Sequence, residues 1–147
     1  MFEPISFFVS GVAKPAGSKR GFFIPKINRV VIVDANPNSK DWKTDVKHAA
    51  SEHYKGPLIE TPIILKLTFF IVRPKGHFRT GKNSNILRDS APAFPTSKPD
   101  VLKLARGVED ALTGIIYKDD SLIVTEHLYK RYCEQPGVQI EISEQTL

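Results

Sequence analysis

Residues 98–120 constrain the fold of this chain more than any other stretch, because they predict a helix with both ends marked. Apolar residues recur at i, i+3, i+4 and i+7, the spacing of one helix face, at Val101, Leu104, Ala105, Val108, Ala111 and Leu112. The carboxylate of Asp100 can accept hydrogen bonds from the first-turn amides, and Gly114 can supply a left-handed end. Asp119 and Asp120 follow among basic residues. Carboxylates before and after the helix suggest a metal-binding site for phosphate chemistry.

The composition predicts one soluble globular domain. At 147 residues, with 41% hydrophobic and 25% charged residues, the chain is long enough to bury its own core. It contains no apolar run of membrane-spanning length, and its first residues lack the pattern of a signal peptide. Cys133 is its only cysteine, which excludes an internal disulfide. We therefore expect a single domain over residues 1–147, in the cytoplasm and without a membrane partner.

The pattern of apolar runs and turn residues predicts an α/β (α+β) domain. We expect a mixed β-sheet and two main helices, because strand-like and helix-like runs alternate irregularly along the chain. The expected strands are 5–12, 22–24, 29–33, 61–72, 122–132 and 138–142, and the expected helices are 40–54 and 101–112. Residues 22–33 predict a hairpin. Residues 73–97 have no periodicity, and a loop of this length is usually functional or mobile.

Positive charge is concentrated in this loop and just after it. The net charge of +5 favours an acidic partner such as nucleic acid. Between residues 73 and 106 only Asp89 and Asp100 are acidic, whereas the basic residues are Arg73, Lys75, Arg79, Lys82, Arg88, Lys98, Lys103 and Arg106. His77, Phe78 and Phe94 are interleaved with them. Cations on such a segment can follow a phosphate backbone, and rings can stack on bases. A solvated surface loop is the alternative.

The acidic residues alone do not identify a site. Magnesium prefers oxygen ligands, and Asp100, Asp119 and Asp120 are of the right type. However, Asp100 also fits a simple helix cap, and Asp119–Asp120 fits a simple turn before a strand. None of the four histidines, His48, His53, His77 and His127, has the spacing of zinc ligands.

A family resemblance favours the metal-binding interpretation. The segment KPDVLKLARGVEDALTGIIYKDDSLI resembles the central motif of the RusA-like Holliday junction resolvases, which is K-P-D-x-D-N-L-x-K, then D-A-L-x-G, then a hydrophobic run and D-D-x-x-[IV]. Looser similarity covers residues 17–20, 34–37 and 77–97. The resemblance implies a RusA-like fold and a phage or prophage homodimer acting in DNA recombination and repair. It also implies that the enzyme nicks two strands of a four-way junction with Mg²⁺, for which Mn²⁺ can substitute.

The same resemblance assigns roles to individual residues. The metal-binding acids of the family correspond to Asp100 and Asp120, with Asp119 beside them, and the helix lysine corresponds to Arg106. We expect Arg106 to act on the scissile phosphate or the leaving charge, with Lys103 assisting. The residues expected to position DNA are Lys14, Lys19, Arg20, Arg73, Lys75, Arg79, Lys82, Arg88, Lys98 and Lys103.

One departure from the family pattern leaves the catalytic assignment open. Leu102 stands where the family has a second acid, and leucine cannot coordinate Mg²⁺. Glu109 lies about 10 Å further along the helix axis than Leu102, which is too far for it to share an ion directly with Asp100. Glu109 and Asp110 are also spaced to pair with Arg106, although a second ion or a water bridge through them stays open. The alternative to a nuclease is a catalytically impaired protein that binds branched DNA, and a generic basic protein ranks third.

Overall fold

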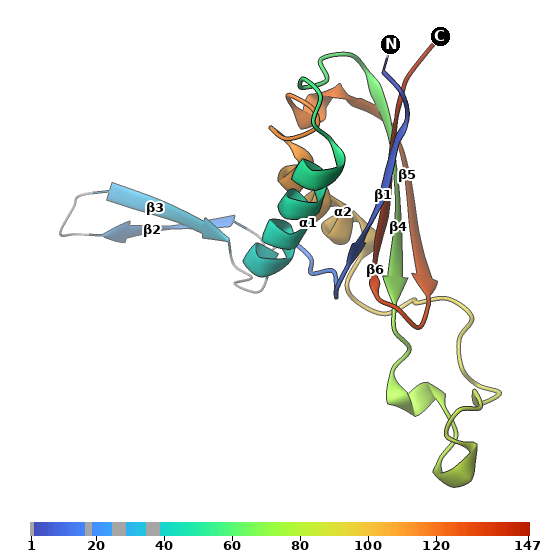
Figure 1. Ribbon diagram of the computed structural model, residues 1–147. Coiled ribbons are helices and arrows are strands. Elements are labelled where there is room, and N and C mark those ends of the chain that lie inside the picture. Colours follow the sequence, from blue (N-terminus) through green and yellow to red (C-terminus); the bar gives the residue numbers. More distant parts are fainter. Residues whose placement is uncertain (1, 17–18, 25–28, 35–38) are drawn as a thin grey trace.

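A four-stranded mixed sheet forms the body of the protein (Figure 1). The computed structural model describes all residues except 1, 17–18, 25–28 and 35–38, with side chains described for 2–16 and 41–147. The strand order is β1-β6-β4-β5, with bounds Ile5–Ser10, Gly137–Glu144, Ile63–Ile71 and Ile123–Tyr132. The β4–β5 pair is parallel and the other pairs are antiparallel, which confirms the predicted mixed sheet.

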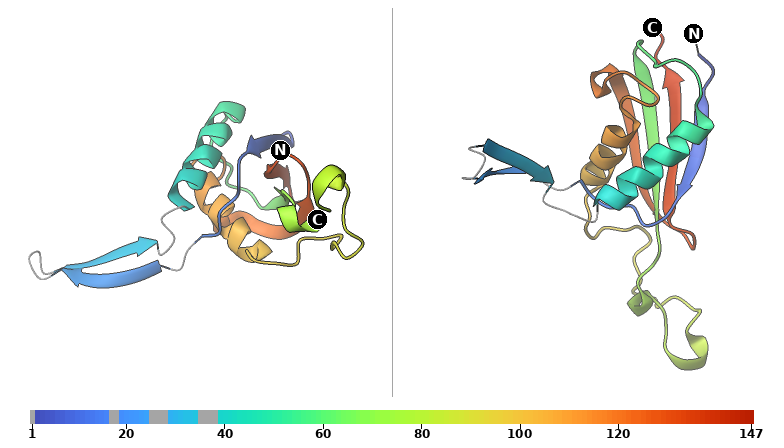
Figure 2. Two further views of the ribbon diagram at one scale, coloured as in Figure 1. Left: turned by 90° about the horizontal axis from the view of Figure 1, so that it is seen from below. Right: turned by 60° about the vertical axis from the view of Figure 1, so that its left-hand side comes forward.

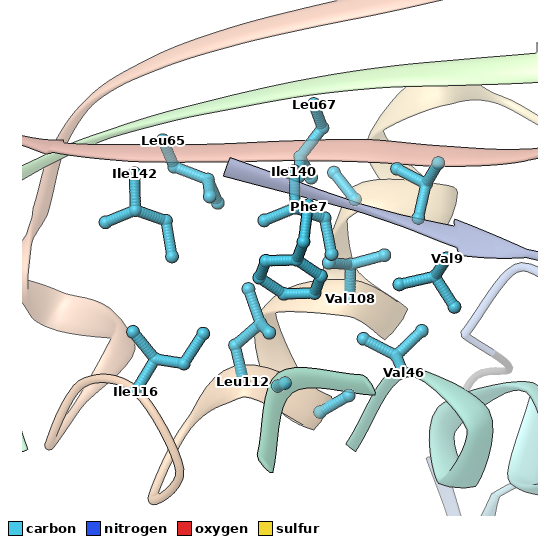
Figure 3. Close-up of a cluster of buried hydrophobic side chains, with 14 of the residues drawn as sticks. Phe7, Val9, Val46, Leu65, Leu67, Val108, Leu112, Ile116, Ile140 and Ile142 are labelled. Atoms are coloured by element: carbon cyan, nitrogen blue, oxygen red, sulfur yellow. The ribbon is translucent and has the colours of Figure 1, made fainter. Parts of the chain in front are cut away.

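Two helices, α1 (Ser39–His53) and α2 (Val101–Leu112), cover one face of this sheet (Figures 1 and 2). Parallel strands need a long crossover connection, and the segment that joins β4 to β5 contains α2. Because side chains alternate between the faces of a strand, β4 buries Leu65 and Leu67 against the helices. Figure 3 shows these side chains converging with residues of β1, β6, α1 and α2, including Phe7, Ile140, Val46 and Val108.

The helix predicted from residues 101–112 is confirmed, together with its buried face. Gly114 adopts a positive φ of 84°, as predicted for the end of the helix. The capping prediction is only half right. Asp100 occupies the N-cap position, but its side chain makes no capping hydrogen bond, and its backbone carbonyl accepts from the amides of Lys103 and Leu104. The Asp100 carboxylate therefore remains available for another partner.

The predicted hairpin forms a separate two-stranded sheet from β2 (Lys19–Ile24) and β3 (Arg29–Asp34). It extends away from the main sheet on the side of the helices (Figure 1). Two of the expected DNA-binding residues, Lys19 and Arg20, lie on β2, and their side chains are outside the described residues.

The segment 73–97 is a long projection below the sheet in Figure 1, and it has more local structure than its sequence indicates. It contains two short 3₁₀ turns, η2 (Lys75–His77) and η3 (Gly81–Asn83), and a β-bridge joins Phe78 to Leu87. We call residues 73–97 the basic loop. No helix among the described residues is long and apolar enough to cross a membrane.

Candidate active site and nucleic-acid interface

Three carboxylates from three elements line one open hollow. Glu109 comes from the last turn of α2, Asp120 from the short helix η4 (Asp120–Leu122), and Glu126 from β5. The hollow has a volume of about 300 Å³. Since negative charges repel one another, such a gathering requires a proton or a cation to offset the repulsion. We call this feature the acidic hollow.

The backbone at the end of α2 fixes the position of Glu109. Its carbonyl accepts hydrogen bonds from the Thr113 hydroxyl at 2.8 Å and from the Tyr117 hydroxyl at 3.0 Å. Tyr117 is completely buried, and burial raises the pKa of its phenol. Burial is also the main reason that the pKa of Glu109 is raised to about 8, followed by a hydrogen bond with Glu126 and repulsion from Glu126, Asp120 and Asp110. The folded protein therefore favours the protonated form of the Glu109 carboxyl group.

Asp119 and Asp120 behave as a hydrogen-bonded pair. The Asp119 carboxylate accepts from the backbone amide of Ser121 at 3.2 Å. That bond, followed by the one with Asp120, lowers the pKa of Asp119. The pKa of Asp120 is raised, chiefly because of its hydrogen bond with Asp119. Both side chains are exposed, so a substrate or ion can reach them.

Asp100 does not join these acids within one chain. It lies at the start of α2, where Lys103 approaches it at 4.0 Å and Lys130 donates hydrogen bonds to the carbonyls of Ser97 and Pro99. Lys130 belongs to the end of β5, whereas the acidic hollow lies at its beginning. At the rise of a strand, Ile123 and Lys130 are about 23 Å apart, and Asp100 and Glu109 are about 13 Å apart along the helix axis. Asp100 is the N-cap of α2 and Asp120 follows the other end of the helix, so the two aspartates lie toward opposite ends of α2.

This separation bears on the magnesium ion that the family resemblance implies. Carboxylate oxygens are suitable ligands for Mg²⁺, but among the described residues no three His, Cys, Asp or Glu side chains are arranged to hold a metal ion. Leu102 projects into solvent with 67% of its surface exposed, so it contributes no ligand either. The predicted set of Asp100, Asp119 and Asp120 does not fit one ion within a single chain.

Three arginines of the basic loop also organise that loop. Arg73 donates to the carbonyl of Pro92 at 2.8 Å and lies over the ring of Tyr132 at 4.3 Å. Arg79 pairs with Asp89 at 3.2 Å, and Arg88 donates to the carbonyl of Gly76 at 3.1 Å. These contacts hold the guanidinium groups in place near the surface.

The predicted lysines are less constrained than these arginines. Lys75, Lys82 and Lys98 are exposed, and the described part of the chain offers them no ion-pair partner. Lys14 lies in a segment that packs closely against α2, because a Cβ atom added to Gly107 would lie 3.4 Å from the carbonyl oxygen of Lys14. These positions suit contacts with a passing phosphate backbone.

The expected pairing of Arg106 with Glu109 and Asp110 is not found among the described contacts. Asp110 pairs instead with Lys43 of α1 at 3.4 Å, and Glu109 faces β5. Arg106 is exposed, which leaves its guanidinium available to a phosphate.

Sequence reasoning missed Glu126 and Lys130. Both lie on β5 at alternate positions with Leu128, on the side that faces α2. Charged residues at inward-facing positions of a strand were the available signal, because such positions are normally apolar.

A basic α+β protein with converging carboxylates and a cationic loop has the features of an enzyme that acts on nucleic-acid phosphodiesters. Comparison with known proteins agrees. The family model described as Endodeoxyribonuclease RusA matches residues 13–143. The chain is 33% identical over 140 residues to the uncharacterized protein YqaN of Bacillus subtilis (strain 168). The aligned region covers 95% of this chain and 96% of that protein. The chain belongs to the RusA endodeoxyribonuclease family.

Proposed function

We propose that this protein is a Mg²⁺-dependent endonuclease that resolves four-way DNA junctions by paired nicks, in recombination and repair of bacterial or phage DNA in the cytoplasm. The observation that carries the proposal is the acidic hollow of this endodeoxyribonuclease-family member, which Glu109, Asp120 and Glu126 line and which a ligand from a second subunit would complete as a metal site. Phosphodiester hydrolysis needs the developing negative charge neutralised and a water molecule activated, and Mg²⁺ held by these carboxylates, or Mn²⁺ in its place, would supply both.

A homodimer accounts for the separation of the two predicted metal-binding ends. Asp100 is the N-cap of α2, which follows the basic loop in the chain, whereas Asp120 lies beyond the other end of this helix. A two-fold axis can place Asp100 of one subunit beside Asp120 of the partner subunit, because an isologous interface joins the same surfaces in opposite directions. Two such composite sites would match the two-fold symmetry of a four-way junction.

The first test is cleavage of a labelled synthetic four-way junction with Mg²⁺ and with chelator. We expect paired nicks with the wild-type protein, only with metal, and loss of product with Asp120→Asn. Asp45→Asn is the matched control, because Asp45 is an exposed acid on α1 that does not line the acidic hollow. Equal cleavage by wild type and Asp120→Asn would contradict the proposal.

Mixed subunits test the composite site directly. Asp100→Asn and Asp120→Asn proteins should each be inactive alone. A heterodimer of the two retains one site with both aspartates, so we expect single nicks to return. If each site were built within one chain, both sites of the heterodimer would be damaged and no product would form.

A branched-DNA binding protein that does not cut is the second candidate. The observation that favours it is Leu102, which is 67% exposed at the position of a family acid. It predicts tight, salt-sensitive junction binding with no product in either Mg²⁺ or Mn²⁺.

A further inference from the structure

We propose that the open face of the main sheet binds unpaired nucleotides of single-stranded DNA through a row of aromatic and cationic side chains. This face is turned away from α1 and α2 (Figures 1 and 2). On β4 it presents the residues that alternate with the buried core, among them Lys66 and Phe70. Because the helices stabilise the sheet from the opposite side, binding here requires no rearrangement of the core.

The centre of the row alternates cations and rings. Lys66 lies 5.7 Å from the centre of the Tyr129 ring, and Arg131 lies 5.0 Å from the same ring. Arg131 also lies 5.2 Å from the centre of the ring of Phe94, which is 55% exposed and belongs to the basic loop. A guanidinium that contacts two rings holds both in a defined position, and an exposed ring offers a face on which a base can stack.

The row continues across the sheet through Phe8 and Phe70. Their ring centres are 6.2 Å apart, and the strand register places Phe70 beside Arg131. In the strand register Gly137 of β6 lies opposite Ser10 of β1 on one side and opposite Phe70 of β4 on the other. A Cβ at this position would collide with the Phe8 ring and with the backbone carbonyl of Val9, so glycine leaves the room that this ring occupies. The row therefore spans all four strands.

Charge and composition favour nucleic acid over an apolar protein partner. Lys66 and Arg131 supply positive charge, and Glu141 pairs with Lys66 at 3.7 Å. The outward positions of β6 are Gln139, Glu141 and Ser143, which are polar and do not form an aliphatic docking face. Stacking rings beside cations are the arrangement that binds bases and phosphates of a single strand with little sequence preference. Phe94 makes the row continuous with the basic loop.

The inference builds on the proposed DNA substrate but not on cleavage. A duplex hides the faces of its bases in the stack, whereas a branch point or a strand end exposes unstacked bases. The basic loop would then hold backbone phosphates while the aromatic row holds the unpaired nucleotides.

The test is fluorescence anisotropy with labelled oligo(dT) of about 15 nucleotides, within the range that one such surface covers, in the presence of chelator. We expect Phe94→Leu and Tyr129→Leu each to weaken binding about tenfold, because leucine keeps apolar volume but cannot stack on a base. Arg131→Ala should weaken it similarly. Tyr54→Leu and Lys47→Ala on α1 and its end are the matched controls, and both should bind like wild type. Binding of a blunt duplex should change less than twofold in all five variants.

Unchanged oligo(dT) binding by Phe94→Leu and Tyr129→Leu would overturn the inference, as would equal weakening by Tyr54→Leu. Sedimentation of the same variants tests a second copy of this chain as the occupant, and a dimer lost only in the aromatic-row variants would also overturn it. The two proposals fail separately. Junction cleavage without row-dependent oligo(dT) binding refutes only this inference, and row-dependent binding without cleavage refutes only the nuclease.

Discussion

The carboxyl group of Glu109 on α2 is hydrogen-bonded to the carboxyl group of Glu126 on β5, and the bond joins the helix layer to the edge strand of the sheet. Two carboxylates can share such a bond only if one of them keeps a proton. The pKa of Glu109 is accordingly raised to about 8, first by burial and then by Glu126. A proton thus offsets the repulsion between these carboxylates, and a bound cation could offset it in the same way.

This relationship predicts that the protein loses stability between about pH 4.5 and pH 8. The native state binds the Glu109 proton up to pH 8, whereas the unfolded chain releases it near the ordinary pKa of 4.5. Because the native state binds more protons over this interval, the free energy of unfolding falls as pH rises through it. Glu109→Gln keeps a hydrogen-bond donor without the ionisation, so its stability should fall less.

Urea denaturation of wild type and Glu109→Gln at pH 5, 6.5 and 8 measures this effect. The free energy of unfolding of Glu109→Gln should rise relative to that of wild type as pH rises. Glu134→Gln is the control, because Glu134 is an exposed acid in the β5–β6 turn, and it should show no such relative rise. Parallel stability curves for wild type and Glu109→Gln would show that the Glu109 proton is not linked to folding.

The sequence predicted α2 well because the information for it is local. The apolar positions, the residue before the helix and Gly114 all lie within one stretch, and their spacing alone defines the buried face. The same locality misleads about the acids. Asp100 and Asp120 belong to one motif, yet the helix between them runs antiparallel to β5 and places them toward opposite ends.

The aromatic row could not be found in this way, because it depends on pairing between distant strands. Tyr129 and Lys66 become neighbours only when β5 pairs with β4, and Phe8 reaches Phe70 only across β6. The basic loop shows a third limit. Its charge was evident from the sequence, but the carbonyl partners of Arg73 and Arg88 were not.

Two leucines of α2 offer a matched test of the packing. Leu112 is fully buried, and its replacement by alanine should cost about 2–5 kcal/mol of unfolding free energy, because a cavity forms in the core. Leu102→Ala changes the same side chain on the same helix at an exposed position, and should change stability by less than about 0.5 kcal/mol. Chemical denaturation of both variants measures the difference, and similar costs at the two positions would contradict the assignment of the buried face.

Leu102→Asp is the substitution that connects stability with activity most directly. Leu102 is the second residue of α2, and the first turn of this helix contains no acid. A carboxylate there interacts favourably with the helix dipole and removes an exposed apolar side chain, so the variant should be as stable as wild type or more stable by about 0.3–1 kcal/mol. It also restores an acid two residues after Asp100.

If Asp100 takes part in metal binding, Leu102→Asp should raise the rate of junction cleavage at a given Mg²⁺ concentration and lower the concentration needed for half-maximal rate. Asparagine has nearly the same shape as aspartate but no charge, so Leu102→Asn should leave both the cleavage rate and the required Mg²⁺ concentration unchanged. Cleavage by Leu102→Asp and Leu102→Asn at the same rate as wild type, with folding intact, would mean that the start of α2 is not part of the catalytic site. Product from Leu102→Asp and none from wild type would identify the natural protein as one that binds branched DNA and has lost its cleavage through this one residue.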